Sequence, residues 1–371
     1  MPKFSTNKKV AIVYDWADTA YGGAEKVLLT LKKIYPQAVL FVPLADRCQA
    51  KWLTEFSELR TGFLQSFPAW VKKNRFLCSL FLPLCVENFD LSGFDLVISV
   101  ASFAAKGVLT KPEQNHVCYL LTPTRFLHSH RREYLPPLGR FLAAPLLAYL
   151  RRWDVVAAGR PDYIIPISHL VAARTQQYYQ RETLPVIYPP LVLTADDHQK
   201  IAKSDFYLAV GRLVAYKKMD LAVRACVATG VKLKVVGTGP QLKKLRTIIR
   251  RARAGERIEL LSRVSDEDLK KLYAQAKAVL MIGEEDFGLV ALEANAAGTI
   301  VVGHQRSGAL EILPSAAKLA LTSDSLLDTI QAIKLLEKRT DWSASPAAGA
   351  YDQAHFAKNW IKQIEKLKSE L

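Results

Sequence analysis

Short apolar runs alternate with longer amphipathic stretches along the chain, which predicts parallel strands alternating with helices. In the first half, the runs that we expect to be buried strands are 10–14, 96–99, 116–120 and 163–167. Helices are predicted at 24–34, after the loop 15–23, and at 169–179, where Ser168 can cap the first turn. This pattern is typical of an α/β domain.

The alternation is interrupted and then restarts. The proline-rich segment 185–190 and the polar segment 194–204 predict a domain boundary. Beyond it, strands are expected at 206–210, 232–236, 258–261, 279–282 and 300–302, and helices at 222–228, 241–253 and 269–277. Ser265 and Asp268 resemble a capping box, and 351–371 has the apolar spacing of an amphipathic helix. We therefore expect two α/β halves with a cleft between them.

Length and composition agree with this organisation. A chain of 371 residues is long for one core, which favours two domains. The 51 basic against 35 acidic side chains give a formal charge of +16, which favours polyanionic partners or simply a soluble basic surface. The five cysteines form no CxxC pair and predict reduced thiols in a cytoplasmic protein. We expect no signal peptide, and the apolar run 141–150 is too short to span a bilayer.

Residues 285–298 carry the strongest local signal. The apolar run 279–282 predicts a buried strand, and the residues from Gly288 onward predict a helix. The helix start then lies at the carboxyl edge of a parallel sheet, where free amides and the helix dipole favour an anion. Glu285 in the loop, and Glu293 about two turns into the helix, can accept hydrogen bonds from hydroxyl groups beside that anion. The pattern favours a nucleotide sugar, and the simpler alternative is ordinary acidity near a helix start.

Two further pairs of residues suit an anionic ligand. Arg212 and Lys217 follow a predicted strand five residues apart, so both cations can reach one diphosphate. Gly22 and Gly23 precede a helix, so backbone amides can approach phosphate or sugar. Taken alone, the two cations are more simply surface residues at a helix start, and the two glycines are a common Gly-Gly turn.

Together these residues resemble a retaining glycosyltransferase of family 4, of the bacterial mannosyltransferase-like subgroup, from Lys9 to the final helix. Beside 285–298, the segments that carry the resemblance are 21–25, 211–218, 237–240 and 262–265. That family has the GT-B fold, an α/β architecture of two Rossmann-like domains facing a cleft. The resemblance implies an acceptor-side domain at 1–190, with the helix 351–371 packing back on it, and a nucleotide-sugar-binding domain at 191–350.

The resemblance also assigns roles to individual residues. Arg212 and Lys217 would neutralise the departing nucleoside diphosphate, and Glu285 would bind hydroxyls of the transferred sugar. Glu293 would hold the ribose hydroxyls. The remaining contacts that it implies are the backbone at Phe287, Gly288 and Leu289, the glycines Gly22, Gly23 and Gly237, and the base-reading residues Arg263 and Val264.

The acceptor side departs from the family pattern. Where the family often has His-Thr-Pro-x-Arg, this chain has Leu121 in place of the histidine. The candidates that remain for this side are Asp15, Lys106 and Arg125. His128 and His130 lie nearby and could substitute for the family histidine, but solvated loop histidines are the commoner case.

The resemblance implies a hexose transfer with retention, by a front-face route in which the departing diphosphate helps to deprotonate the acceptor. Asp196 and Asp197 lie in the linker, and no Asp-x-Asp metal site is evident, so we expect no metal and no cofactor. The preferred donor is GDP-mannose. The expected acceptor is a glycan or a lipid-linked molecule in cell-surface polysaccharide synthesis.

Other interpretations stay open. Basic and aromatic residues alternate in 63–89 and 138–153, which fits either an anionic membrane surface at the inner face of the cell membrane or the rim of a domain core. The basic segment 243–253 raises nucleic-acid binding, but no nucleic-acid motif accompanies it and we expect no such partner. A third alternative keeps the fold and makes the protein a nucleotide-sugar epimerase or a phosphorylase.

Overall fold

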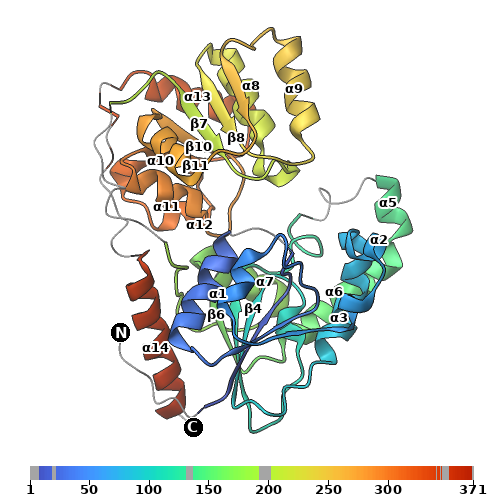
Figure 1. The fold of residues 1–371 in the computed structure, drawn as a ribbon. Helices are drawn as coiled ribbons and strands as arrows, with labels where there is room; N and C mark the ends of the chain where they lie inside the picture. The colour runs from blue at the N-terminus through green and yellow to red at the C-terminus, as the bar shows by residue number, and fades with distance from the viewer. Residues whose placement is uncertain are drawn as a thin grey trace. The chain divides into compact units, whose positions relative to one another are not determined.

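The structure is a computed structural model that describes residues 8–18, 22–130, 137–191, 202–339, 341–342, 344 and 351–369. The chain forms two compact units (Figure 1). Unit 1 comprises Met1–Pro190 and Gln353–Leu371, and unit 2 comprises Leu191–Asp352. Tyr21 and the aspartates of the predicted linker, Asp196 and Asp197, lie outside the described residues.

Unit 1 is built on a six-stranded parallel sheet with the order β3-β2-β1-β4-β5-β6. Its strands are β1 (Val10–Tyr14), β2 (Val39–Val42), β3 (Leu59–Thr61), β4 (Leu96–Ala101), β5 (Asn115–Leu120) and β6 (Tyr163–Pro166). The first strand lies inside the sheet between β2 and β4, which is the strand order of the Rossmann fold. The predicted strands are confirmed, and β2 and β3 extend the sheet beyond them.

The helices of unit 1 connect these strands. They are α1 (Gly23–Ile34), α2 (Ala69–Lys72), α3 (Arg75–Glu87), α5 (Pro137–Leu142), α6 (Ala144–Ala158), α7 (His169–Tyr179) and α14 (Gln353–Ser369), with short 3-10 turns η1 (Lys51–Glu55), η2 (Phe63–Ser66) and η3 (Ala105–Gly107). The predicted cap of α7 is confirmed, because Ser168 Oγ accepts a hydrogen bond from the Val171 amide at 3.1 Å.

Helix α14 packs onto unit 1 although unit 2 separates it from the rest of that unit in sequence (Figure 1). Its Trp360 is fully buried and meets the ring of Tyr119 on β5 with centroids 5.8 Å apart. The Trp360 indole also donates to Tyr35 Oη at 3.1 Å, beside the end of α1. The last helix is therefore part of the core of unit 1.

Unit 2 repeats the same topology. Its parallel sheet has the order β12-β11-β10-β7-β8-β9. The strands are β7 (Tyr207–Val210), β8 (Leu233–Val236), β9 (Ile258–Leu261), β10 (Ala278–Met281), β11 (Ile300–His304) and β12 (Lys318–Leu321). The first strand, β7, again lies between the second strand and the fourth. The α/β architecture with two Rossmann-like halves is thus confirmed.

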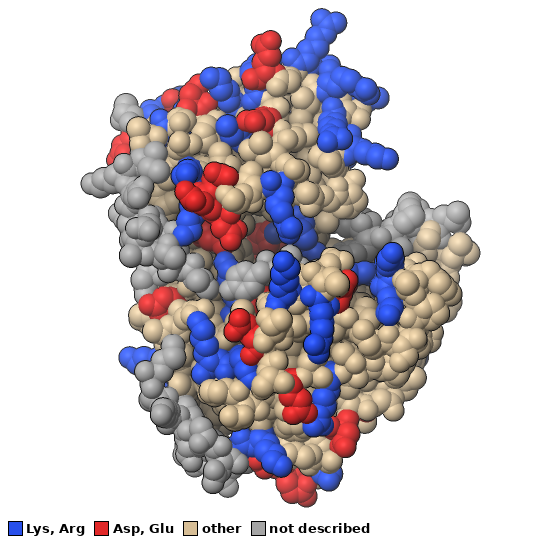
Figure 2. Space-filling model, viewed as in Figure 1, with Lys and Arg blue, Asp and Glu red and all other residues tan. Residues whose placement is uncertain are grey.

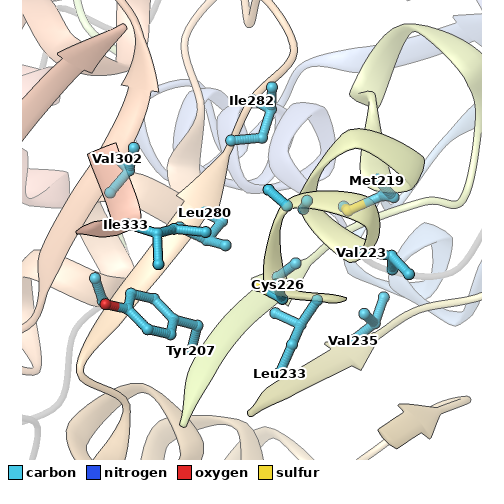
Figure 3. Close-up of a cluster of buried hydrophobic side chains, with 14 of the residues drawn as sticks. Tyr207, Met219, Val223, Cys226, Leu233, Val235, Leu280, Ile282, Val302 and Ile333 are labelled. Atoms are coloured by element: carbon cyan, nitrogen blue, oxygen red, sulfur yellow. The ribbon is translucent and has the colours of Figure 1, made fainter. Parts of the chain in front are cut away.

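The helices of unit 2 are α8 (Met219–Thr229), α9 (Leu242–Arg251), α10 (Asp266–Gln275), α11 (Leu289–Ala296), α12 (Gly308–Glu311) and α13 (Leu326–Leu336), with 3-10 turns η5 (Ala215–Lys217) and η6 (Ser315–Ala317). Ser265 caps α10 as predicted, since the Asp268 amide donates to its hydroxyl at 3.1 Å. Apolar side chains of the central strands and of α8 and α13 fill the core, and among them are Tyr207 and Met219 (Figure 3). This core holds β7 and β10 side by side, and so positions the loops that follow them.

Candidate active site

The candidate site lies in unit 2, at the carboxyl ends of β7 and β10. The connections from these neighbouring strands leave the sheet in opposite directions, because β8 follows on one side and β11 on the other. Such a topological switch point is where open α/β sheets bind their ligands. The loop after β7 carries Arg212 and Lys217, and the loop after β10 carries Glu285.

The structure brings Lys217 and Glu285 together. The Lys217 ammonium donates to Glu285 Oε1, and the two side chains are 18% and 9% exposed. Arg212 is exposed, and its guanidinium donates to Tyr216 Oη at 3.0 Å in the same loop. The Lys217 ammonium lies 5.7 Å from the centre of the Tyr216 ring. One aromatic side chain therefore contacts both cations that the sequence assigned to the diphosphate.

The loops can pack this closely because a glycine stands at the contact. A Cβ on Gly283, two residues after the end of β10, would overlap the Tyr216 carbonyl oxygen and approach Lys217 Cα within 2.9 Å. On the other side of β7, a Cβ on Gly237 would overlap the carbonyl oxygen of Gly211. The predicted site residue Gly237 thus lies against the loop that carries Arg212. Only a glycine leaves room for the Gly211 carbonyl at this contact.

Helix α11 begins beside this pair. Gly288 is its N-cap, with φ of 80°, a left-handed conformation that favours glycine. Phe287 is buried just before the helix, and Leu289 is its half-buried first residue. The first amides of α11 have no partners within the helix and carry the positive end of its dipole. An anion bound at this end would lie beside Glu285.

Glu293 is the fifth residue of α11, about one turn into the helix, where the sequence predicted two turns. Its Oε2 accepts a hydrogen bond from Tyr273 Oη on α10 at 3.1 Å. Burial, together with the charge and hydrogen bond of Glu293, raises the pKa of Tyr273 well above its usual value. Tyr273 therefore stays protonated and keeps donating, which fixes one side of the Glu293 carboxylate.

Sequence reasoning missed Ser307, which holds the backbone of Glu285. The Glu285 amide donates to Ser307 Oγ at 3.1 Å, and Ser307 Oγ donates back to the Glu285 carbonyl at 3.1 Å. The Gly308 amide donates to that same carbonyl at 2.8 Å. Ser307 follows β11, which pairs with β10 in the sheet. A serine just after the strand next to β10 is the sequence feature that could have identified it.

The remaining predicted residues of unit 2 lie on the loop after β9. Arg263 is exposed and Val264 is half-buried there. The Gly237 amide donates to the carbonyl of Leu261, the last residue of β9, at 2.9 Å. The loops after β7, β8 and β9 thus follow one another along the carboxyl edge of the sheet, with Arg263 and Val264 two strands from β7.

Gly22 and Gly23 lie in unit 1, at the start of α1. Gly22 is the N-cap and Gly23 the first helical residue, and a Cβ on Gly22 would come within 2.9 Å of Glu25 Oε2. Glu25 is buried in the first turn, where its Oε1 accepts from Tyr14 Oη at 3.0 Å. A buried carboxylate therefore already lies at the amino end of this helix.

The prediction that Asp15 faces an acceptor is corrected by the structure. Asp15 follows β1 and is fully buried. Its carboxylate accepts from the backbone amides of Ser102, Phe103 and Ala105 at 2.6 to 2.8 Å, and from Ser102 Oγ at 2.9 Å. These four donors belong to the loop after β4, so Asp15 joins two neighbouring strand ends of unit 1.

Lys106 and His128 need the same correction. Lys106 is fully buried and pairs with Asp154 of α6, with Nζ 2.6 Å from Oδ1, so it does not face solvent. The His128 side chain, predicted to be solvated, is 1% exposed, and its Nε2 lies 2.9 Å from the second oxygen of Asp154. The hydroxyls of Thr124 and Tyr179 donate to Asp154 at 2.7 and 2.8 Å. The loop after β5 is thus fastened to α6 and α7, while Arg125 is half-buried in it.

Metal-ligating side chains do not gather in the described part of either unit. Within those ranges, no three His, Cys, Asp or Glu side chains lie together in an arrangement that could hold a metal ion. The helices of the same ranges also lack the length and apolar character that a bilayer crossing requires.

Comparison with known proteins points to one family for unit 2. Residues 194–344 match the family described as glycosyl transferases group 1. An uncharacterized glycosyltransferase of Methanocaldococcus jannaschii is 35% identical over 111 residues. That match spans 29% of this chain and 28% of the relative. The switch-point loops therefore lie within the region that matches glycosyl transferases group 1.

Solved structures resemble the chain over almost its whole length. Anabaena HepE, crystallised in complex with UDP, has a TM-score of 0.69 at 16% identity, with 96% of this chain and 100% of that chain covered. The lipopolysaccharide outer core galactosyltransferase WaaB has a TM-score of 0.65 at 16% identity, with 98% and 100% covered. At these identities the likeness shows the fold, which is that of GT-B glycosyltransferases.

Proposed function

We propose that the protein is a glycosyltransferase that moves a hexose from a nucleotide diphosphate sugar to a glycan or lipid-linked acceptor. The observation that carries this proposal is the contact between Lys217 and Glu285 at the ends of β7 and β10. A cation, a carboxylate and the amino end of α11 meet there, within the region that matches glycosyl transferases group 1.

The site chemistry suits a nucleotide sugar in two ways. An ammonium has three N–H donors, so the bond from Lys217 to Glu285 leaves donors for a diphosphate oxygen. A guanidinium at Arg212 and the amides of α11 add positive charge for the same anion. Glu293, held by Tyr273, can accept hydrogen bonds from ribose hydroxyls, and Glu285 from the hydroxyls of the sugar.

We propose that transfer retains the anomeric configuration. The bond between the anomeric carbon and the diphosphate oxygen breaks, and the acceptor oxygen bonds to that carbon from the same face. The acceptor proton passes to the departing diphosphate, whose developing charge Arg212 and Lys217 stabilise. Because Glu285 is already paired with Lys217, it is assigned to sugar binding and not to nucleophilic attack. Neither a metal nor a cofactor is assigned to the step, so excess EDTA should leave the rate unchanged.

The donor is proposed by resemblance and by the structural neighbours. Mannose from GDP-mannose follows from the resemblance of the chain to bacterial mannosyltransferase-like enzymes. UDP-glucose is the second candidate, because HepE has been crystallised in complex with it. The acceptor class and a place in cell-surface polysaccharide synthesis follow from the same resemblance.

A binding experiment tests the proposal without knowledge of the acceptor. We expect a nucleotide sugar or its nucleoside diphosphate to raise the melting temperature in a concentration-dependent way. Lys217→Ala should weaken that ligand about tenfold or more, since it removes a charged hydrogen-bond donor. The matched control is Lys271→Ala, which removes an exposed lysine paired with Glu267 on α10 and should leave binding unchanged. Equal binding by both variants, or no binding of any nucleotide, would contradict the assignment.

A further inference from the structure

Unit 1 exposes large apolar side chains on helices that are neighbours in the fold. On α2 and α3, Trp70 is 69% exposed and Leu84 is 55% exposed, with Phe76 and Phe81 also exposed. The buried side of α3 is apolar as well, with Cys78, Leu82, Cys85 and Val86 in the core. Helix α3 is thus apolar on its outer side as well as its inner one, whereas a surface helix normally turns polar residues outward.

Helices α5 and α6 continue this apolar surface. Phe141 is 77% exposed on α5, and the exposed apolar side chains of α6 include Tyr149, Val155 and Val156. The two groups of helices are joined, because Trp153 Nε1 of α6 donates to Glu87 Oε1 at the end of α3 at 2.7 Å. Figure 2 shows a broad tan area over the side of unit 1 where α3 and α6 lie in Figure 1. We call the exposed residues of α2, α3, α5 and α6 the apolar face.

The charges within this face all have one sign. The segments 63–86 and 137–153 contain no Asp or Glu, although they contain several Lys and Arg residues. Lys73 is exposed between α2 and α3, and Arg151 and Arg152 are exposed beside Tyr149. Arg75 is paired, with its guanidinium 2.7 Å from Asp18. Apolar side chains interspersed with cations are the composition of surfaces that lie in the headgroup region of anionic membranes.

A pocket of about 660 Å³ extends the apolar face towards the edge of the sheet. Its apolar walls include Phe63, Leu84, Phe41 and Phe89, and its polar walls include Arg60, Asn88 and Asp90. The pocket is therefore a recess of mixed polar and apolar character beside the apolar face, and the exposed side chains of the helices provide the apolar surface.

We propose that unit 1 binds the surface of an anionic lipid bilayer through the apolar face. The helices concerned lie in the interface and do not cross the bilayer, since none of the described helices could span it. A second copy of the chain fits the face less well. In a two-fold interface the same patch meets itself, so Arg151 and Arg152 would face like charges with no carboxylate from these segments to pair with. Anionic headgroups supply the missing charge.

Flotation with vesicles tests this proposal independently of glycosyl transfer. The wild-type protein should float with vesicles of phosphatidylglycerol and phosphatidylcholine at low salt, and about tenfold less with phosphatidylcholine alone or at about 0.5 M salt. Arg151→Glu/Arg152→Glu and Phe81→Ser/Leu84→Ser should each reduce flotation by about tenfold or more. The matched control is Arg246→Glu/Arg250→Glu, which makes the same charge change on exposed positions of α9 in unit 2 and should float like the wild type.

Two further measurements keep the outcomes distinct. Brominated lipid should quench Trp70 fluorescence in the wild type, and Trp70→Phe should lose that component. Each variant should keep the nucleotide-induced thermal shift of the wild type, which shows that it is folded and separates failure of docking from failure of the proposed function. The proposal is overturned if the wild type does not float at low salt, or if the α9 variant loses as much binding as the α6 variant. It is also overturned if light scattering shows a dimer that Phe81→Ser/Leu84→Ser dissociates.

Discussion

Lys106 and Asp154 form an ion pair in the interior of unit 1, with side chains 1% and 0% exposed. Burial by itself would raise the pKa of Asp154. The Lys106 charge and hydrogen bonds from His128, Lys106 and Thr124 outweigh it and lower the pKa to about 2. Since the same carboxylate also accepts from Tyr179, it connects the loops after β4 and β5 to two helices.

Asp154→Asn should destabilise unit 1 by about 3 kcal/mol or more at neutral pH, because it leaves the buried Lys106 charge uncompensated. The folded-state pKa of Asp154 lies below its ordinary value, so its stabilisation is fully present above about pH 4 and is lost as the pH falls towards 2. The difference between wild type and variant in urea unfolding should therefore shrink with acidification. An exposed pair gives the control, since Glu267→Gln should cost less than about 1 kcal/mol at any pH.

Tyr273→Phe should weaken donor binding while leaving turnover of the bound donor nearly unchanged. The variant removes the donor that orients Glu293, so KM for the nucleotide sugar should rise about threefold to tenfold with little change in kcat. Tyr207→Phe is the matched control. It removes a tyrosine hydroxyl that donates to Glu337 Oε1 at 2.7 Å. Tyr207 is the first residue of β7, so this hydrogen bond lies at the amino edge of the sheet, opposite the candidate site. An equal rise in KM for both variants would show that the effect does not pass through Glu293.

Gly283→Ala should separate the two loops of the candidate site. Its methyl group would overlap the backbone of Tyr216 and Lys217, and backbone cannot move aside as a flexible side chain would. We expect a loss of stability of about 1 to 3 kcal/mol and a clear loss of donor binding. Gly255→Ala adds the same group where nothing lies within 4 Å, so its melting temperature and donor affinity should match the wild type.

Ser307→Ala should disturb Glu285 through its backbone. The Glu285 amide would lose its acceptor in a buried position, at a cost of about 1 to 3 kcal/mol. The carbonyl would keep the bond from Gly308. Steady-state kinetics should show a lower kcat/KM for the nucleotide sugar. Ser307→Thr keeps the hydroxyl and should restore most of it; if both variants behave alike, the hydroxyl does not position Glu285.

The sequence predicted most of the strands that are buried along their whole length, although it missed β2, whose four residues are all buried. Strands such as β1 and β4 are buried along their whole length and appear as unbroken apolar runs. The strands that sequence reasoning missed are short. Strand β3, at the edge of its sheet, has three residues with Arg60 exposed in the middle, and β12 has four with only its last residue buried. Their pairing comes from the neighbouring strand, which a local pattern does not contain.

The sequence identified residues of the candidate site, but it did not predict which of them contact one another. Arg212, Lys217 and Glu285 could be named from their motifs. The pairing of Lys217 with Glu285 depends on β7 lying beside β10, although β8 and β9 come between them in the chain. Ser307 was missed for the same reason, because its contact with Glu285 depends on β11 lying beside β10. Asp15 and Lys106 were candidates for the acceptor side, but in this fold the partners of both are protein groups.

The position of α14 has a consequence for the order in which the protein can fold during synthesis. The helix that buries Trp360 against Tyr119 follows all of unit 2 in the chain, so a ribosome completes the second unit before it delivers the last part of the first. Until then Tyr119 and the neighbouring surface of β5 lack their cover, and the nascent chain exposes an apolar strand face to its surroundings. Unit 1 begins first and is completed last, which reverses the usual expectation that the amino-terminal domain finishes folding before the next one begins.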